Sequence, residues 1–229
     1  MPAPLQGIKA CIFDAYGTLF DVHTPVLRAL AALDDDKAQS LSATWRDKQL
    51  QYAWLRSLMG VHSDFWQVTS DALDHAMQLF GLDDRELHRR LMELYLRLDP
   101  FQDAEPTLID LQRRGLRLAI LSNGSPAMLD GVLRASGLAR CFDQVISVEE
   151  VGIFKPSRRV YRHAQQVLKF ASPHDVCFIS ANSWDAKAAA SFGFQVAWIN
   201  RSGGPADCIP GAPALELESL EALPRHIGR

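Results

Sequence analysis

The fold of this chain is decided close to its N-terminus by residues 8–18, IKACIFDAYGT. The run is mostly apolar up to Phe13 and stops at Asp14. A short apolar run of this kind predicts a strand that is buried on both faces. Because ligands bind at the carboxyl ends of the strands in open parallel sheets, Asp14 is expected where a substrate would bind.

The same pattern recurs along the chain, with helical patterns between the apolar runs. Further strands are expected at residues 116–121, 144–148, 176–179 and 195–199. Helices are expected at residues 105–114 and 126–136, directly after Lys155-Pro156, and at 184–192. Three of these helical patterns stop at a glycine, which is typical of a helix C-terminus. Strand and helix in alternation predict an α/β fold, a Rossmann-like, doubly wound parallel sheet covered by helices.

Residues 24–98 break this alternation, because they contain no convincing strand. Residues 41–59 carry apolar side chains at helical spacing, and residues 83–86 resemble a capping box with an aspartate as the cap. We expect an all-helical cap of about four helices, inserted directly after the first strand. The predicted division is a cap of residues 21–98 and a catalytic core of residues 1–20 and 99–229.

Composition and charge exclude several classes of function. The chain has 229 residues, 48% of them hydrophobic, and a net charge of −3 with acids and bases interspersed. It offers no basic face for nucleic acid, no polybasic segment and no apolar run near the roughly 18 residues of a membrane span. We therefore expect neither a nucleic-acid nor a membrane partner.

The cysteines and the N-terminal residues predict the cellular compartment of the protein. The four cysteines are widely spaced, with no Cys-x-x-Cys pair, and three lie in apolar runs. This favours reduced, buried thiols. The N-terminal residues show no signal-peptide pattern. Together these features predict a cytoplasmic protein.

Polar side chains follow several of the predicted strands. Asp14 ends the first strand, and Ser122 with Asn123 ends the second. Lys155 lies at a later strand-to-helix junction, and the loop at residues 180–185, SANSWD, follows the strand at 176–179. Since the carboxyl ends of parallel strands meet at one edge, a carboxylate, a hydroxyl–amide pair, a lysine and a second carboxylate should share one crevice.

This order of four motifs resembles the haloacid dehalogenase superfamily over residues 8–199. Two positions at which this chain differs from most members of the superfamily indicate its subclass. Its phosphatases carry a general acid two residues after the nucleophile, where this chain has Tyr16. The last motif offers only one carboxylate, Asp185, whereas Mg²⁺ prefers several hard oxygen ligands. Phosphoryl transfer would lack its acid and its metal, so we expect no metal and no cofactor.

Displacement of halide needs a carboxylate nucleophile but no acid for the leaving group. Five stretches closely resemble the L-2-haloacid dehalogenases of type II. They are residues 13–19, FDAYGTL, then Trp45-Arg46 with Lys48-Gln49-Leu50, residues 121–124, LSNG, Lys155-Pro156, and the 180–185 loop. The resemblance implies a metal-independent hydrolase that converts short (S)-2-haloacids into (R)-2-hydroxyacids and halide with inversion. It also implies a small anionic substrate and a homodimer.

The resemblance implies a role for each residue of the catalytic group. Asp14 would attack C2 and form an ester, which water then hydrolyses. Lys155 would keep Asp14 ionised, because a nearby cation favours the charged carboxylate. Thr18 and Ser180 would hold Asp14 by hydrogen bonds. Asp185 would either orient the hydrolytic water or anchor Lys155, and both alternatives stay open. Tyr161 is the last residue of the expected catalytic group. It would form a hydrogen bond to a residue of the site without touching the substrate itself.

A second group would bind the substrate. The substrate carboxylate would contact Ser122, Asn123 and the backbone amides of Ala15 and Tyr16, since backbone donors at such a turn suit an anion. Arg46 would receive the departing halide, with Asn182 and Trp184 lining the same space. The apolar wall around the substrate side chain would consist of Tyr16, Leu50, Phe65 and Trp184.

Two other functions remain open from the residues alone. Asp14, Lys155 and Asp185 also suit a Mg²⁺-dependent phosphatase or phosphonatase of the same superfamily, and a non-catalytic, protein-binding role is possible on a fold with many functions. Three tryptophans of the predicted cap, Trp45, Trp54 and Trp66, either form an apolar surface for a homodimer or pack the cap itself.

Overall fold

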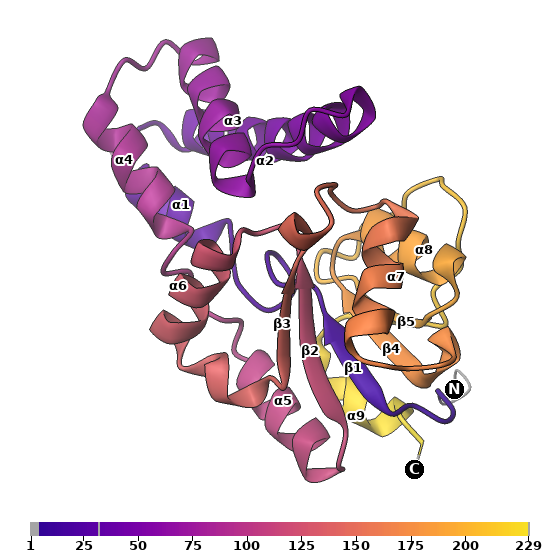
Figure 1. Cartoon of the computed structure of the whole chain (residues 1–229). Helices are drawn as coiled ribbons and strands as arrows, with labels where there is room; N and C mark the ends of the chain where they lie inside the picture. Colours follow the sequence, from indigo (N-terminus) through magenta and orange to yellow (C-terminus); the bar gives the residue numbers. More distant parts are fainter. Residues whose placement is uncertain (1–4, 32, 229) are drawn as a thin grey trace.

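The computed structural model describes residues 5–31 and 33–228. At its centre lies a six-stranded sheet with the order β3-β2-β1-β4-β5-β6, in which every neighbouring pair is parallel (Figure 1). The strands are β1 (Ala10–Phe13), β2 (Arg117–Ser122), β3 (Gln144–Ser147), β4 (Val176–Ser180), β5 (Gln195–Ile199) and β6 (Leu215–Leu217). The five predicted strands and the parallel sheet are confirmed. Strand β6 was not predicted, because this three-residue strand has a charged residue, Glu216, at its centre.

Strand β1 lies in the middle of the sheet and is buried along its whole length. Its last residue, Phe13, pairs with Ile120 of β2 and with Ile179 of β4. The next amide, that of Asp14, donates a hydrogen bond of 2.9 Å to the Ile179 carbonyl oxygen. The register therefore brings the ends of three strands to one edge of the sheet, with Asp14 at the centre.

Helices cover both faces of the sheet, with α6 on one side and α7 and α8 on the other (Figure 1). The helices of this part are α5 (Ala104–Arg113), α6 (Pro126–Ser136), α7 (Arg158–Val167), α8 (Ser183–Phe192) and the short α9 (Leu223–His226). Helix α7 begins later than predicted, at Arg158 rather than directly after Lys155-Pro156. The side chain of Ser157 caps it by accepting a hydrogen bond from the Arg159 amide.

The segment between β1 and α5 is helical, as expected. It forms α1 (Thr24–Ala29), α2 (Asp35–Met59), α3 (Phe65–Leu79) and α4 (Arg85–Leu94), with no strand among its described residues. Aspartates cap three of these helices, because Asp34, Asp64 and Asp84 each accept from amides of the following turn. Helices α2 and α3 pack against each other. Figure 1 shows the four helices gathered beyond one end of the sheet.

The chain leaves the sheet for these helices and returns at neighbouring positions. The Asp21 amide donates to the Asp99 carbonyl oxygen at 3.0 Å, and the Phe101 amide donates to the Leu19 carbonyl oxygen at 2.9 Å. These two hydrogen bonds hold the start and the end of the helical segment side by side. We retain residues 21–98 as the proposed limits of the helical cap, and residues 1–20 and 99–229 as those of the core.

The cysteines of the chain are thiols. Cys11, Cys141 and Cys177 are buried and Cys208 is exposed, and none forms a disulfide. Cys11 and Cys177 are register partners on β1 and β4, and the contact with Cys177 together with burial raises the pKa of Cys11. Within residues 5–31 and 33–228, no helix combines the length and the apolar character that a membrane crossing requires.

Candidate active site

Asp14 lies where β1 ends and is held by hydrogen bonds from several elements. Its side chain is almost buried. Oδ1 accepts from Lys155 Nζ at 3.0 Å, while Oδ2 accepts from Thr18 Oγ1 at 3.1 Å and from Asn182 Nδ2 at 2.7 Å. Ser180 Oγ lies 3.4 Å from the same Oδ2. The carboxylate is therefore fixed in position by one cation and three neutral donors.

Thr18 and Asn182 connect Asp14 to the loop after β4. The Thr18 hydroxyl accepts from the Ala181 amide at 2.8 Å, so its proton is free to point at Asp14. Asn182 Nδ2 also reaches the Tyr16 carbonyl oxygen at 3.3 Å. Asn182 was expected beside the halide, and it contacts the nucleophile as well. The 180–185 loop thus helps to orient Asp14 directly.

Lys155 lies between two buried carboxylates. Its side chain is only 1% exposed, and Nζ is 3.0 Å from Asp14 Oδ1 and 2.7 Å from Asp185 Oδ2. Burial alone would lower the pKa of Lys155, but the two carboxylates outweigh it and raise this pKa above its usual value. The ammonium therefore stays charged next to Asp14.

Asp185 is buried and has a partner on each oxygen. Oδ2 accepts from Lys155, and Oδ1 accepts from the Tyr161 hydroxyl at 2.6 Å. Burial raises the pKa of Asp185 to about 6, against the opposing pull of Lys155. Among the described residues, no three His, Cys, Asp or Glu side chains are grouped in a way that could hold a metal ion. Because both oxygens of Asp185 have partners, the geometry favours the anchoring of Lys155 over the activation of water by Asp185.

Ser122 and Asn123 form the turn after β2, next to Lys155. Ser122 Oγ accepts from the Gly124 amide at 3.1 Å, and Asn123 Oδ1 accepts from the Lys155 amide at 2.9 Å. Gly124 is needed for close packing, since a Cβ atom there would lie 2.7 Å from Cε2 of Tyr16. With its oxygen occupied, Asn123 has its amide NH₂ left to offer an anionic group.

Arg46 reaches the site from α2. Its Nη2 lies 3.4 Å from Asn182 Oδ1, and its Nη1 donates to Gln49 Oε1 at 2.5 Å. A cavity of about 480 Å³ opens beside this contact, lined by residues that include Gly17, His23, Arg46 and Asn182. The cap and the core therefore meet at Arg46 and Asn182, next to the nucleophile.

Aromatic side chains enclose the other side of the site. The Tyr16 ring lies 6.5 Å from that of Phe65 and 5.7 Å from that of Tyr95. Trp184 meets Trp54 edge-on at 5.4 Å, which joins α8 to the cap. Phe65 is buried and Leu50 is partly buried. The Tyr16 hydroxyl is buried without a hydrogen-bond partner among the described residues.

Three residues of the site were not predicted from the sequence. Gln49 bonds to Arg46, Tyr95 packs against Tyr16, and the Phe154 ring lies 5.8 Å from that of Phe65. Gln49 had a usable signal, because residues three apart on a helix share a face. Tyr95 had none, because it lies far along the chain from every motif.

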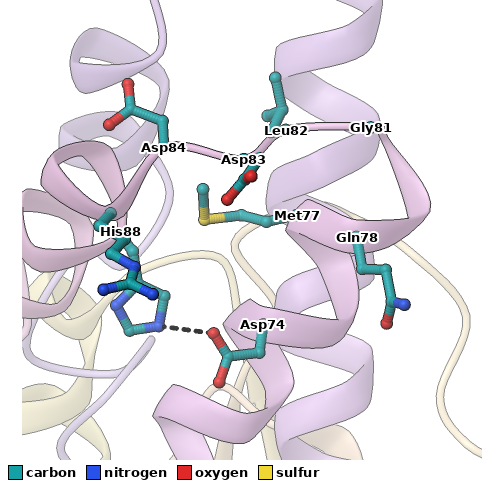
Figure 2. A pocket seen from close by; sticks show the side chains of 9 residues that line it. Asp74, Met77, Gln78, Gly81, Leu82, Asp83, Asp84 and His88 are labelled. Atoms are coloured by element: carbon teal, nitrogen blue, oxygen red, sulfur yellow. Dashed lines mark ion pairs between the residues drawn. The ribbon is translucent and has the colours of Figure 1, made fainter.

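Another cavity, of about 690 Å³, lies between α3 and α4 (Figure 2). It is lined by Met77, Asp83 and other side chains, and an ion pair of 3.2 Å joins His88 to Asp74 across it. None of the predicted site residues lines this cavity. The chemistry is therefore assigned to the edge of the sheet.

Known proteins share this sequence and this fold. The family described as haloacid dehalogenase-like hydrolase matches residues 8–193. (S)-2-haloacid dehalogenase 1 of Pseudomonas sp. (strain CBS-3) is 45% identical over 226 residues, which are 98% of this chain and 99% of that protein. The (S)-2-haloacid dehalogenase of Pseudomonas sp. (strain YL) is 45% identical over 220 residues, with 96% of this chain and 94% of that protein covered.

A solved structure of a relative has the same fold as this chain. The L-2-haloacid dehalogenase of Xanthobacter autotrophicus with chloropropionic acid covalently bound has a TM-score of 0.85 and 37% identity, over 95% of this chain and 97% of that one. Both the sequence and the fold match along nearly the whole length. The chain belongs to the haloacid dehalogenase-like hydrolases and, among them, to the L-2-haloacid dehalogenases.

Proposed function

We propose that this protein hydrolyses short (S)-2-haloacids to (R)-2-hydroxyacids and halide. The observation that carries the proposal is the Asp14 carboxylate, held 3.0 Å from the buried Lys155 ammonium with neutral donors on its other oxygen. A fixed, charged carboxylate with an adjacent cation suits nucleophilic attack on a small anion. The relatives named above carry this activity in their names.

The first step is a displacement at C2. An Asp14 carboxylate oxygen attacks from the side opposite the halogen, the new C–O bond forms, and the carbon–halogen bond breaks. The halide leaves with the electron pair of that bond, and C2 is inverted. No acid is needed because halide is a stable anion, which accounts for Tyr16 at the position where the phosphatases have their acid.

The second step is hydrolysis of the ester. Water attacks Cγ of Asp14, the bond from Cγ to the substrate oxygen breaks, and that oxygen takes one proton from the water. The other proton is released, and the Asp14 carboxylate is restored with an oxygen from water. Lys155 stays anchored by Asp185 through both steps, with Tyr161 holding Asp185 in turn.

The substrate is oriented by groups on both sides of Asp14. The amide NH₂ of Asn123, the hydroxyl of Ser122 and the amides of Ala15 and Tyr16 bind the carboxylate. This is supported by the bond of Asn123 to the Lys155 amide and by backbone donors at the turn after β1, which suit an anion. Arg46 and Asn182 receive the halide, because the guanidinium is the cation that the cap brings to the nucleophile. Tyr16, Leu50, Phe65 and Trp184 contact the substrate side chain.

The reaction is proposed to need no metal. A Mg²⁺ ion prefers several oxygen ligands, and here the ammonium of Lys155 lies between the two carboxylates that would have to supply them. The relatives also favour the dehalogenase over the phosphatase and over a non-catalytic role.

Halide release in the presence of a chelator tests the proposal. Purified protein with excess EDTA is mixed with (S)-2-chloropropionate, with the (R) enantiomer as the control, and chloride is measured by ion chromatography. We expect release from the (S) enantiomer alone and (R)-lactate as the product. No halide from any short (S)-2-haloacid, or phosphate release from phosphate esters that EDTA abolishes, would refute the proposal.

We also propose that the protein is cytoplasmic and forms a homodimer. Four free cysteines suit the reducing cytoplasm. A homodimer is supported by exposed apolar side chains at the end of α2 and in the next loop, where Leu58 is 85% exposed and Met59 71%. Trp45 and Trp54 do not contribute to that surface, because Trp45 is buried and Trp54 packs on Trp184. Sedimentation of the protein and of Leu58→Asp tests the dimer.

A further inference from the structure

Gln49 is a buried polar residue to which the proposed reaction gives no role. It lies on α2, three residues after Arg46, and its side chain is fully buried. Its Oε1 accepts from Arg46 Nη1 at 2.5 Å, and its Nε2 donates to Thr69 Oγ1 at 2.7 Å. Thr69, on α3, is also fully buried. A burial this complete requires that both ends of the amide have partners, and both do.

The hydrogen bonds fix which way the Gln49 amide faces. The Thr69 hydroxyl has one proton, which it donates to the Phe65 carbonyl oxygen at 2.6 Å. Only its lone pairs remain for Gln49, so the amide must turn its NH₂ to Thr69 and its oxygen to Arg46. The Thr69 carbonyl in turn accepts from Trp45 Nε1 at 2.9 Å, which ties the same turn of α3 back to α2. The acceptor that faces Arg46 is therefore set by the packing of two helices.

We propose that Gln49 is the positioning residue for Arg46, which holds the guanidinium toward Asp14 without neutralising its charge. The proposal rests on the proposed function, in which Arg46 receives the halide. Among the described residues, the other hydrogen-bond partner of Arg46 is the Asn182 amide, which is neutral like that of Gln49. A carboxylate at position 49 would keep the hydrogen bond and would pair with the charge.

Two variants separate orientation from charge. Gln49→Glu keeps the shape and the bond to Arg46 but places an anion against the guanidinium. Gln49→Met keeps the volume and removes the acceptor. The matched control is Gln51→Met, because Gln51 lies on the same helix but is exposed and accepts from Lys48 instead of Arg46. Thermal melts of all three establish that the fold persists.

The readout is the dependence of the rate on the leaving group. Steady-state release of chloride and bromide is measured from (S)-2-chloropropionate and (S)-2-bromopropionate, together with product inhibition by added halide. Chloride is the poorer leaving group, so it depends more on Arg46. We expect both Gln49 variants to lose about tenfold or more in kcat/KM for the chloro acid and several-fold less for the bromo acid. In Gln49→Met the cause is the lost hydrogen bond to a charged group, and in Gln49→Glu it is the pairing of the new carboxylate with the guanidinium. Inhibition by added halide should weaken, and the control should match the wild type.

Several results would overturn the proposal. Equal losses for the two acids would mean that Gln49 serves only the packing of the cap. Unchanged kinetics in Gln49→Glu would mean that halide release does not depend on an uncompensated charge on Arg46. If neither variant folds, NMR of ¹⁵N-arginine-labelled wild type decides, with Arg46→Lys for assignment: slow rotation of the Arg46 guanidinium supports the proposal, and fast rotation refutes it. A wild type that releases no halide would instead refute the proposed function.

Discussion

Replacing Lys155 by methionine tests the charge balance of the site most severely. The ammonium contacts Asp14 Oδ1 at 3.0 Å and Asp185 Oδ2 at 2.7 Å, and all three side chains are buried. Methionine fills a similar volume and carries no charge. The variant would therefore leave two carboxylates close together, in a buried place, without their cation.

The expected cost follows from these contacts. Removal of one partner of a buried ion pair costs about 3–5 kcal/mol, because the other charge is left uncompensated. Domains of this kind are stable by about 5–15 kcal/mol, so the variant should fold with a much reduced free energy of unfolding. Adding Asp185→Asn removes one of the orphaned charges, and the double variant should recover about 1–3 kcal/mol relative to Lys155→Met.

The cost should also depend on pH. Burial already raises the pKa of Asp185 to about 6, and loss of the lysine would raise it further. A carboxyl group whose pKa is raised in the folded state contributes stability at low pH that is lost as the pH rises through that pKa. The deficit of Lys155→Met against the wild type should therefore be larger at pH 8 than at pH 5.

Urea unfolding followed by tryptophan fluorescence measures these free energies, because Trp54 and Trp184 meet between the cap and the core. Both proteins and the double variant are unfolded at pH 5 and pH 8. A loss below about 1 kcal/mol at pH 8, typical of an exposed pair, would refute the reasoning. So would a deficit that grows as the pH falls.

Three further results are expected. The value of kcat/KM should fall as the pH drops below about 6, because protonation of Asp185 releases one anchor of Lys155. A pH profile of kcat/KM for the wild type and for Asp185→Asn checks this, and the fall at low pH should be absent from the variant. Tyr161→Phe should lower the free energy of unfolding by about 1–3 kcal/mol, because Asp185 Oδ1 loses its 2.6 Å donor, and urea unfolding measures it. Phe65→Ala should cost about 3–5 kcal/mol and raise KM, since a buried ring beside Tyr16 is lost; unfolding and kinetics together test it, and an unchanged KM would remove Phe65 from the substrate site.

The core of the site was predictable because parallel sheets bring their strand ends together. Asp14, Ser122 and Lys155 each follow a strand or a strand-to-helix junction, so their meeting follows from topology alone. The sequence does not decide whether Asp185 anchors Lys155, because the direction of a side chain within a loop depends on packing. The Tyr161 hydroxyl, which occupies the other oxygen of Asp185, favours the anchor.

The contribution of the cap was harder to predict. Helical periodicity identifies which face of α2 is buried, but it does not say where that helix lies relative to the sheet. Arg46 could be assigned to the site only through the family resemblance. Gln49 lies three residues after Arg46 on the same face of α2, but this spacing alone does not show that the two side chains bond. Tyr95 joins the site through the packing of the residues at the end of α4. Strand β6 was missed because three residues are too few to show a period.

The covalent role of Asp14 can be measured directly by isotope incorporation. The protein is run through many turnovers of (S)-2-chloropropionate in H₂¹⁸O and digested, and the peptide that contains Asp14 is weighed and sequenced by mass spectrometry. Heavy oxygen should be present in the Asp14 carboxyl group and absent from a sample incubated without substrate. If lactate forms with ¹⁸O in its hydroxyl from the first turnover while the Asp14 peptide stays light, water attacks C2 itself and no ester is formed on this chain.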